Sequence, residues 1–322
     1  MTDARRDLLA EVAWLHHGYH RTQEEIATRL GVSRSTISRA LAEAERLGII
    51  QVVVTAPLPR EARLSADLAR SLGITAIVGV AADGDEPFTA AARAAARLVD
   101  RIVDAGPATI AVSWGRTLAA TARMVRPRTT RDVEILDAVG HPGGEGLVPT
   151  VDVTRSLAAA LGAAVTHVPA PAFVDPGPSR DALLASEPVA RALARARRAD
   201  VTLVSVGVVG AGSLLAAAGG IDARRMAELQ TRGAVGEILG HYFDQGGQDV
   251  EGAGTGSIGL TLDDLRASRR VIAVAGGPEK ADALRAALAG GIVREAVIDD
   301  TMAATLLQAA PVPVGTAEGV PR

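Results

Sequence analysis

The sequence predicts an α/β protein in which an N-terminal helix-turn-helix domain of the winged type precedes a larger, Rossmann-like parallel-sheet domain. Two observations support this fold class. Residues 22–47 read as two capped helices joined at a glycine, and from residue 73 onward short apolar runs alternate with amphipathic helices. With 322 residues, the chain is long enough for two or three domains.

The signals for the helix-turn-helix lie at the ends of its two helices. Thr22 is suited to cap the first helix, and Glu25 three residues later completes a capping box. Gly31 can end that helix in the left-handed conformation, and Ser33 can cap the second helix. We expect the buried positions to be Ile26, Ala27 and Leu30 on the first helix, Val32 in the turn, and Ile37, Ala40, Leu41, Ala44 and Leu47 on the second.

The outward face of the second helix carries short hydroxyls and two arginines, with no carboxylate until Glu43. Arginine can read guanine in the major groove, and hydroxyls can contact bases or phosphates. A solvated helix of a small helical domain would show the same periodicity, but the caps, the turn glycine and the carboxylate-free face together favour DNA binding. The residues expected to contact double-stranded operator DNA are Thr22, Ser33, Arg34, Ser35, Thr36, Ser38 and Arg39.

The composition limits the classes of protein that this chain can belong to. Its net charge of -3 provides no global basic field, so DNA affinity depends on where the arginines lie. The absence of cysteine excludes disulfides and thiolate metal sites. No apolar run is long enough to span a bilayer and no secretory signal is present, so we expect a soluble, cytoplasmic protein that does not enter membranes. The histidines at positions 16, 17 and 20 favour solvation over metal binding, and neither a metal nor a cofactor is expected.

The remaining elements follow in order along the chain. A supporting helix is expected over residues 5–16 and a strand over 49–54, directly after the second reading helix. Pro57 and Pro59 form a stiff spacer, so we place the domains at 1–56 and 57–322, with a helix over 60–72. The strands then predicted cover 74–80, 109–112, 133–138, 201–206, 271–275 and 296–298, and the helices cover 88–103, 117–125, 151–161, 278–288 and 301–309.

Ligands of open parallel sheets bind at the carboxyl ends of the strands, so the loops there are the candidate sites. The first runs from Ser113 through Trp114, Gly115 and Arg116 to Thr117, where glycine lets the backbone approach a ligand and the following helix begins with free amides. An ordinary tight turn would have the same length, but the arginine favours contact with a phosphate or carboxylate.

Three further loops contribute candidates. The glycine-rich segment 140–146 precedes Asp152, which faces either a sugar hydroxyl or water. The loop that begins at Gly207 resembles a dinucleotide fingerprint only loosely and favours a backbone cradle for a smaller ligand. Lys280, the single lysine of the chain, sits in the first turn of a helix, where only a bound anion makes a cation favourable. Asp244 is a weaker candidate for accepting a hydroxyl.

These segments together resemble the SorC family of bacterial sugar-responsive transcription regulators, over nearly the whole chain. The resemblance rests on residues 23–27, 32–39, 112–118, 169–172, 233–237, 242–244, 257–260 and 274–277. It implies a second domain with the fold of sugar-phosphate isomerases and CoA transferases that binds an effector without turnover. Such effectors are typically phosphorylated sugars or related polyols, and the assemblies are often dimers or tetramers on palindromic operators.

The resemblance also implies roles for individual residues. Arg116 and Thr117 would contact the phosphate, Lys280 would assist them, and Asp244 lies in the region that helps to line the pocket. The chain departs from the family on the helix after the glycine-rich loop, where Asp152 and Thr154 stand in place of Asn or Gln. An aspartate there would repel a phosphate but favour sugar hydroxyls, so the effector is either bound differently or less charged.

The sequence therefore predicts a DNA-binding repressor or activator whose operator binding is controlled by a small carbohydrate effector and which forms a homodimer or homotetramer. No nucleophile–base pair or paired carboxylates fall at matching strand ends, which argues against an enzyme. The alternative is a sugar-phosphate isomerase-like enzyme with a DNA-binding head. A DNA-binding scaffold without a ligand is a third reading.

Overall fold

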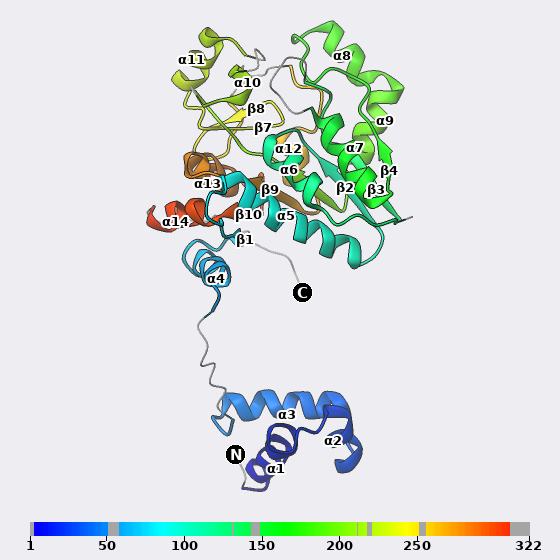
Figure 1. Ribbon diagram of the computed structural model, residues 1–322, viewed down its shortest axis with the longest axis vertical. Helices are drawn as coiled ribbons and strands as arrows, with labels where there is room; N and C mark the ends of the chain where they lie inside the picture. Colours follow the sequence, from blue (N-terminus) through cyan, green and yellow to red (C-terminus); the bar gives the residue numbers. More distant parts are fainter. Residues whose placement is uncertain are drawn as a thin grey trace. The chain divides into compact units, whose positions relative to one another are not determined.

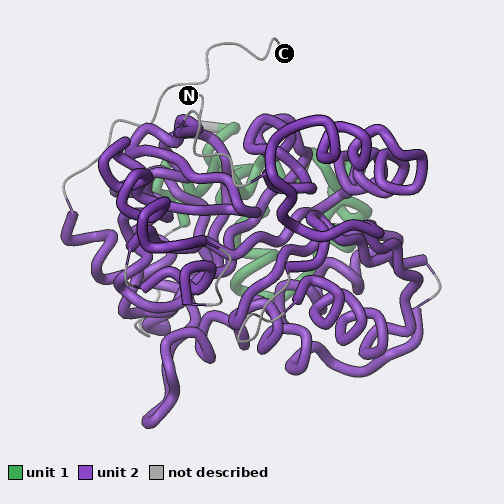
Figure 2. The backbone as a smooth tube through the Cα atoms, turned by 90° about the horizontal axis from the view of Figure 1, so that it is seen from above, with its two compact units in different colours: residues 1–58 green, residues 59–322 purple. Residues whose placement is uncertain are grey.

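The computed structural model describes residues 3–50, 58–130, 132–142, 149–210, 212–217, 221–250 and 256–309. The chain divides into two compact units, unit 1 (Met1–Leu58) and unit 2 (Pro59–Arg322) (Figure 2). Most of the strand predicted over 49–54, and with it the wing, lies outside the described residues, as does most of the glycine-rich loop 140–146. In the described part of the chain, no helix is long and apolar enough to cross a membrane.

The described residues of unit 1 form three α-helices, labelled in Figure 1, and one π-helical turn. The hydroxyl of Thr22 accepts from the Glu25 amide at 3.2 Å, and the Glu25 carboxylate accepts from the Thr22 amide at 2.8 Å, so the capping box is confirmed. Gly31 has φ 66°, the left-handed conformation that was predicted, and Ser33 caps the second reading helix. The elements are α1 (Asp3–Ala13), η1 (Trp14–Gly18), α2 (Gln23–Leu30) and α3 (Arg34–Arg46).

The core of unit 1 joins all three α-helices. Leu9 and Val12 of α1 pack against the buried sides of α2 and α3, as the spacing of their apolar residues predicted. Two expected core positions are wrong. Val32 is 41% exposed because its amide bonds to the Ala27 carbonyl, which closes the turn through the backbone, and Leu47 is 38% exposed because α3 ends one residue earlier.

The centre of unit 2 is a seven-stranded sheet in the order β1-β10-β9-β5-β2-β3-β4, in which every neighbouring pair is parallel. This confirms the predicted parallel sheet. The carboxyl ends of its strands therefore lie along one edge. The strands are β1 (Thr75–Gly79), β2 (Ala108–Val112), β3 (Val133–Asp137), β4 (Ala164–Thr166), β5 (Val201–Val204), β9 (Val271–Ala275) and β10 (Glu295–Asp299).

Helices cover both faces of this sheet (Figure 1). Strand β9 illustrates the two layers, because Ile272 and Val274 join the core on one face while Val271, Ala273 and Ala275 join the core on the other. The first face is covered by α5 (Pro87–Asp104), α6 (Arg116–Met124) and α7 (Thr150–Leu161). The second is covered by α4 (Arg60–Leu72), α12 (Leu262–Ala267), α13 (Ala281–Ala289) and α14 (Asp300–Gln308).

A small antiparallel sheet, β6-β7-β8, stands beside the carboxyl ends of the main strands. Its β7–β8 hairpin turns through Leu239 and Gly240, both with positive φ (55° and 81°), the conformation that a two-residue hairpin needs. The sequence did not predict this sheet. Its strands are β6 (Gly207–Val208), β7 (Gly236–Ile238) and β8 (His241–Phe243). The helices near them are α10 (Leu214–Ala217), α11 (Ala223–Thr231) and η2 (Pro278–Lys280). Helices α8 (Pro178–Ala185) and α9 (Glu187–Ala196) lie across unit 2, where α9 packs against β3 (Figure 1).

Candidate functional site

A cavity of about 430 Å³ opens where the loops after β2, β5 and β9 meet. Its position is the one that parallel sheets use for ligands, beyond the carboxyl ends of the strands. Predicted candidates that line it are Trp114, Gly115, Arg116, Thr117, Gly207 and Lys280. The structure thus brings together three loops that the sequence singled out separately.

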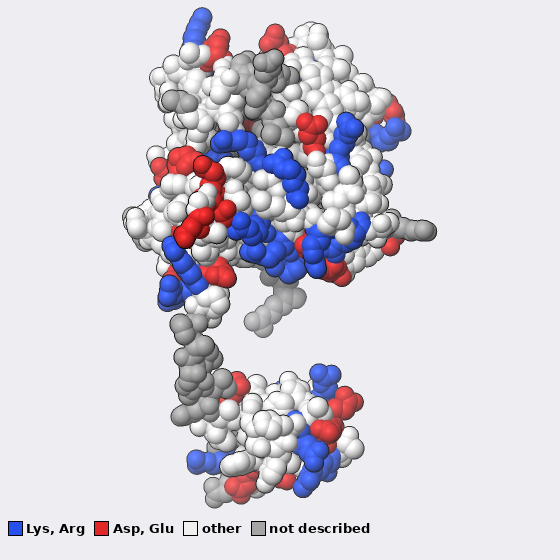
Figure 3. All heavy atoms as spheres, viewed as in Figure 1, with Lys and Arg blue, Asp and Glu red and all other residues white. Residues whose placement is uncertain are grey.

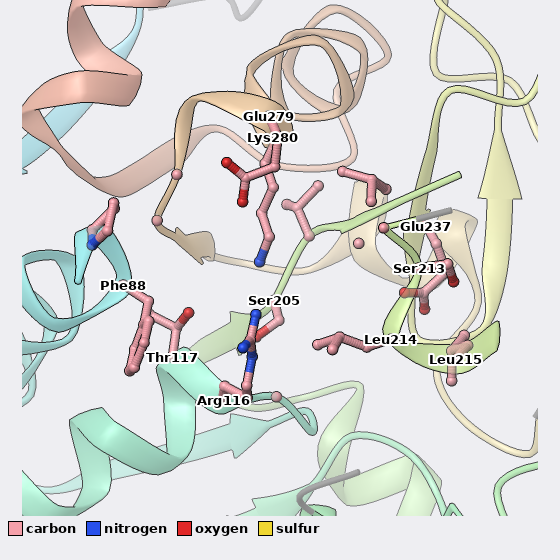
Figure 4. Close-up of a pocket in the computed structure, with 18 of the residues that line it drawn as sticks. Phe88, Arg116, Thr117, Ser205, Ser213, Leu214, Leu215, Glu237, Glu279 and Lys280 are labelled. Carbon is pink, nitrogen blue, oxygen red and sulfur yellow. The ribbon is translucent and has the colours of Figure 1, made fainter. Parts of the chain in front are cut away.

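Two cationic side chains reach into this cavity from opposite walls. Arg116 begins α6 and Lys280 ends η2, and their charged ends point toward one another (Figure 4). The guanidinium carbon of Arg116 lies 5.7 Å from the ring centre of Phe88, which adds a cation–π contact. Within the described ranges, neither cation has a carboxylate within ion-pair distance, so both charges remain available to a ligand.

Glycines allow the walls of the cavity to approach each other closely. Gly115 has φ 133°, and a Cβ there would lie 2.4 Å from the Ser205 hydroxyl. A Cβ on Gly276 would lie 2.4 Å from the Phe88 Cα, so the loop before Lys280 packs directly on the start of α5. A side chain at either position would clash, so glycine is needed at both. The close approach of the two loops positions Arg116 and Lys280, which follow these glycines in the sequence.

Lys280 is held in a setting that disfavours its own charge. Burial lowers the pKa of its ammonium, and Arg116 lowers it further, while Glu279, Glu237 and Asp299 oppose this shift. A bound anion would oppose this lowering of the pKa, because its charge would offset that of Arg116 and stabilise the ammonium. The electrostatics of the pocket thus favour a ligand that carries negative charge.

The start of α6 adds backbone donors to the same region. The first amides of an α-helix have no partner within the helix and carry the positive end of its dipole. Gly115 caps α6 without a side-chain bond, and Thr117 of its first turn lines the pocket. Amides, guanidinium and ammonium therefore converge on one region, an arrangement suited to a phosphate or carboxylate.

The pocket is also lined by an acid and hydroxyls that sequence reasoning missed: Glu237 and Ser213 lie away from the cations, whereas Ser205 lies beside Arg116 (Figure 4). Glu237 is buried, and burial raises the pKa of its carboxyl to about 7, while the Gly240 amide and Lys280 lower it. Ser213 lies beside it, and the hydroxyl of Ser205 has no hydrogen-bond partner in the described structure (Figure 4). The only sequence signal was an acidic residue inside an apolar three-residue strand, which is too short for periodicity to reveal.

Three predicted residues are not among those that line this pocket. The hydroxyl of Ser113 is buried, donates to the Trp114 carbonyl and accepts from the Ser205 amide, each at 3.0 Å, so it fastens two loops together. Asp152 is exposed in the first turn of α7. The carboxylate of Asp244 accepts from the amides of Gly246 and Gln248 at 2.9 Å and stabilises a turn.

In unit 1, the face predicted to read DNA is open to solvent. Arg34, Ser35, Ser38 and Arg39 are exposed, and Thr36 is half-buried. The hydroxyls of Thr22 and Ser33 are already used in the helix caps, so any contact from them must come at the expense of those bonds. Basic and acidic side chains are interspersed on the face of unit 1 seen in Figure 3, which agrees with an affinity that depends on where individual arginines lie.

Comparisons with known proteins cover both units. The family model Sugar-bind, described as "Putative sugar-binding domain", matches residues 57–308, and the MarR family model matches residues 1–57. The chain is 30% identical to the Erythritol catabolism regulatory protein EryD of Brucella abortus (strain 2308), over 95% of this chain and 98% of that protein. It is 26% identical to the Deoxyribonucleoside regulator of Bacillus subtilis (strain 168), over 95% of this chain and 99% of that protein.

Solved structures show the same architecture. The full-length Sorbitol Operon Regulator SorC from Klebsiella pneumoniae aligns with a TM-score of 0.71 and 26% identity, over 95% of this chain and all of that one. A DeoR family transcriptional regulator from Listeria monocytogenes aligns with a TM-score of 0.71 and 25% identity, over 77% of this chain and all of that one. These likenesses confirm the predicted fold class.

Proposed function

The chain belongs to the SorC-type family of sugar-binding transcriptional regulators, and from this premise we propose that the pocket of unit 2 binds a phosphorylated sugar or polyol. The protein is a DNA-binding transcription regulator with a helix-turn-helix domain and a sugar-binding domain. The names of its relatives, which include regulators of erythritol catabolism and of the sorbitol operon, support a small carbohydrate as the effector.

One observation carries the assignment of the pocket, namely that Arg116 and Lys280 converge in it without a carboxylate partner among the described residues. A phosphate has the charge and the number of acceptors to bind both cations and the amides at the start of α6. The part of the pocket around Glu237 and Ser213 would then take the hydroxyls of the carbohydrate.

The proposed coupling between the two units is thermodynamic. An effector shifts the protein between states only by its difference in affinity for them. We propose that the effector draws the loops after β2, β5 and β9 together, changes subunit packing, and so alters the spacing of the reading heads in a dimer or tetramer. Arg34 and Arg39 of each head would contact the major groove, with half-sites about 10 base pairs or a multiple apart.

A catalytic role is the competing function, and one observation favours it. Glu237 has a pKa raised to about 7 and shares the pocket with Lys280, which is the setting of a general acid or base. The relatives are named as regulators, which supports ligand binding without turnover. It also supports a cytoplasmic location, where a transcription regulator meets DNA. Conversion of ribose or glucosamine phosphates by the purified protein would establish the enzyme instead.

A thermal-shift screen tests the proposed function. Sugars, polyols and their phosphates are added to the purified full-length protein, and a ligand that binds only the folded state raises the melting temperature. Phosphorylated compounds should raise it more than their unphosphorylated counterparts, and Lys280→Ala should remove that difference. A screen in which no compound of either kind shifts the wild type would contradict the proposal.

A further inference from the structure

Unit 1 exposes two aromatic side chains on one side, in a chain with only 2% aromatic residues. Trp14 is 68% exposed and Tyr19 is 69% exposed, and their ring centres are 6.5 Å apart. Neither belongs to the α3 face that the DNA would occupy. Paired exposed aromatics on a small domain are typical of a protein–protein contact.

Trp14 borders an open crevice of about 510 Å³ between α1, η1 and the segment after α3. The crevice is lined mainly by small or apolar residues: Ala10, Ala13, Trp14, His17, Gly18, Ile49 and Ile50. A neighbouring stripe of α1, with Leu9 and Val12, is already buried in the core of unit 1. Helix α1 therefore carries a second apolar stripe that the described residues of unit 1, 3–50 and 58, leave open.

The indole of Trp14 is held in place by its own turn. A Cβ on Gly18 would lie 2.3 Å from Cε3 of Trp14, so the ring packs directly over the glycine backbone in the π-helical turn η1. The indole therefore rests on the backbone of its own turn and remains 68% exposed. A rigid, exposed aromatic next to an unfilled apolar crevice has the form of an anchor and its pocket.

We propose that this stripe of α1 is the contact between the unit 1 heads of two copies of the chain. If two α1 helices cross antiparallel on the side of Ala10 and Ala13, with the two-fold axis at the level of residue 12 along the helix, Trp14 of each copy lies over Ala10 of the other. The same symmetry places Asp7 opposite His17. On each side of the axis, a large side chain (Trp14) faces a small one (Ala10) and an acidic side chain (Asp7) faces a basic one (His17), as a self-complementary two-fold interface requires.

Charge and size complementarity favour a second copy over DNA as the occupant. A DNA-binding surface needs several cations, whereas the lining of the crevice holds only His17 as a basic residue. Asp7 is exposed and, among the described side chains, makes no ion pair. Alanines at positions 10 and 13 let two helices approach closely, so Trp14 could insert without rearrangement of unit 1.

This inference rests on the proposed function in one respect, since paired heads presuppose an oligomer on DNA. Fixed pairing of the heads would set the distance between the two α3 helices, which operator reading requires. The test below uses neither DNA nor an effector, so its failure is distinguishable from failure of the proposed function.

Disulfide trapping in the full-length protein tests the contact. The chain has no cysteine, so Ala13→Cys introduces a single thiol next to the proposed axis. Mild oxidation should give about fivefold or more disulfide-linked dimer than Ala4→Cys, because only position 13 falls within the Cα separation that a disulfide spans. Ala4 is the matched control, an exposed alanine of the same helix that points roughly 180° away, nine residues or two and a half turns earlier.

Two further variants, each in the Ala13→Cys background, separate this contact from random collision and from misfolding. Trp14→Ala should reduce the yield of dimer several-fold, while circular dichroism shows whether unit 1 still folds. Asp7→Arg should reduce the yield as well, and adding His17→Asp should restore it. Equal trapping at positions 4 and 13, or no restoration by the charge exchange, would overturn the proposal.

Discussion

The guanidinium of Arg116 and the ammonium of Lys280 point toward each other across one pocket, although like charges repel (Figure 4). The fold sustains this arrangement at the expense of the Lys280 ammonium, whose pKa is lowered by burial and by Arg116. A lysine whose pKa is lowered by burial and a neighbouring cation, in a pocket, marks a candidate ligand site. An anionic ligand is the partner that would relieve the repulsion.

Replacement of Lys280 should remove much of the affinity for an anionic effector. Lys280→Ala deletes one charged hydrogen bond, worth roughly 1.5–3 kcal/mol, so the effector Kd should rise about 10- to 150-fold. Isothermal titration with a phosphorylated compound identified by thermal shift measures this change. Arg198→Ala, which removes an exposed arginine outside the pocket, is the control and should leave the Kd unchanged. A Lys280→Ala variant with wild-type affinity would place the phosphate elsewhere.

Glu237 should make the stability of unit 2 depend on pH in a particular direction. Its pKa is raised to about 7 in the folded protein, so the folded state holds this proton more tightly than the unfolded chain does. The contribution of this proton to the free energy of unfolding is complete below pH about 4.5, declines as the pH rises toward 7 and is absent above that. Over this window the wild type should lose up to about 3 kcal/mol of unfolding free energy relative to Glu237→Gln.

Urea unfolding of both proteins between pH 5 and pH 8 measures this difference. The Gln variant keeps the shape of the side chain and cannot titrate, so the gap between the two curves isolates the carboxyl. Parallel curves across the whole range would show that Glu237 stays ionised and that its burial is relieved by another group.

Arg34 should contribute to DNA affinity without affecting effector binding. Loss of one arginine contact to a base is worth about 1–3 kcal/mol, so Arg34→Ala should weaken operator binding about 5- to 150-fold. Footprinting or fluorescence anisotropy on an operator selected from random duplexes measures it. Arg46→Ala, an exposed arginine at the far end of α3, serves as the control. An unchanged footprint for Arg34→Ala would mean that α3 is not the reading helix.

A methyl group at Gly115 should disrupt the pocket through two distinct effects. The residue has φ 133°, and a Cβ there would meet the Ser205 hydroxyl at 2.4 Å, so Gly115→Ala introduces both backbone strain and a clash. Gly84→Ala is the matched control, because Gly84 has φ 81° and open space around it and therefore reports strain alone, about 1–3 kcal/mol. Gly115→Ala should destabilise unit 2 by more than this, and Ser205→Gly should restore part of the loss. Equal effects of the two alanine variants would show that the loop after β5 can move aside.

Features with a local cause could be predicted from the sequence. The capping box of Thr22 and Glu25 and the left-handed Gly31 depend on neighbours a few residues away, and both were predicted correctly. The buried strands of the large sheet were found because continuous apolar runs leave a clear signal, as in β9, whose bounds match the prediction. Arg116 and Lys280 were found because glycine-rich loops after such strands indicate ligand contact.

Features that depend on distant partners were missed. Strand β7 has only three residues, too few to show a periodic pattern in the sequence. Glu237 is placed in the pocket by the hairpin that follows β7, whose turn has a positive φ at Leu239, and the sequence does not predict such a turn at a leucine. Asp244 and Ser113 have side chains that could bind a ligand. The Asp244 carboxylate instead accepts a hydrogen bond within a turn, and the Ser113 hydroxyl accepts one from the loop after β5. A side chain's chemistry can be read from the sequence, whereas its hydrogen-bond partners depend on the tertiary fold.

The central claim is that a small metabolite in the pocket of unit 2 changes the DNA affinity of unit 1. The most direct measurement is the Kd of the full-length protein for a selected operator, with and without a compound that raises its melting temperature. Couplings between such sites are typically 1–3 kcal/mol, so the account predicts a change of about 5- to 150-fold in the wild type and none in Lys280→Ala. A compound that binds the wild type tightly yet leaves its operator Kd unchanged would contradict the account.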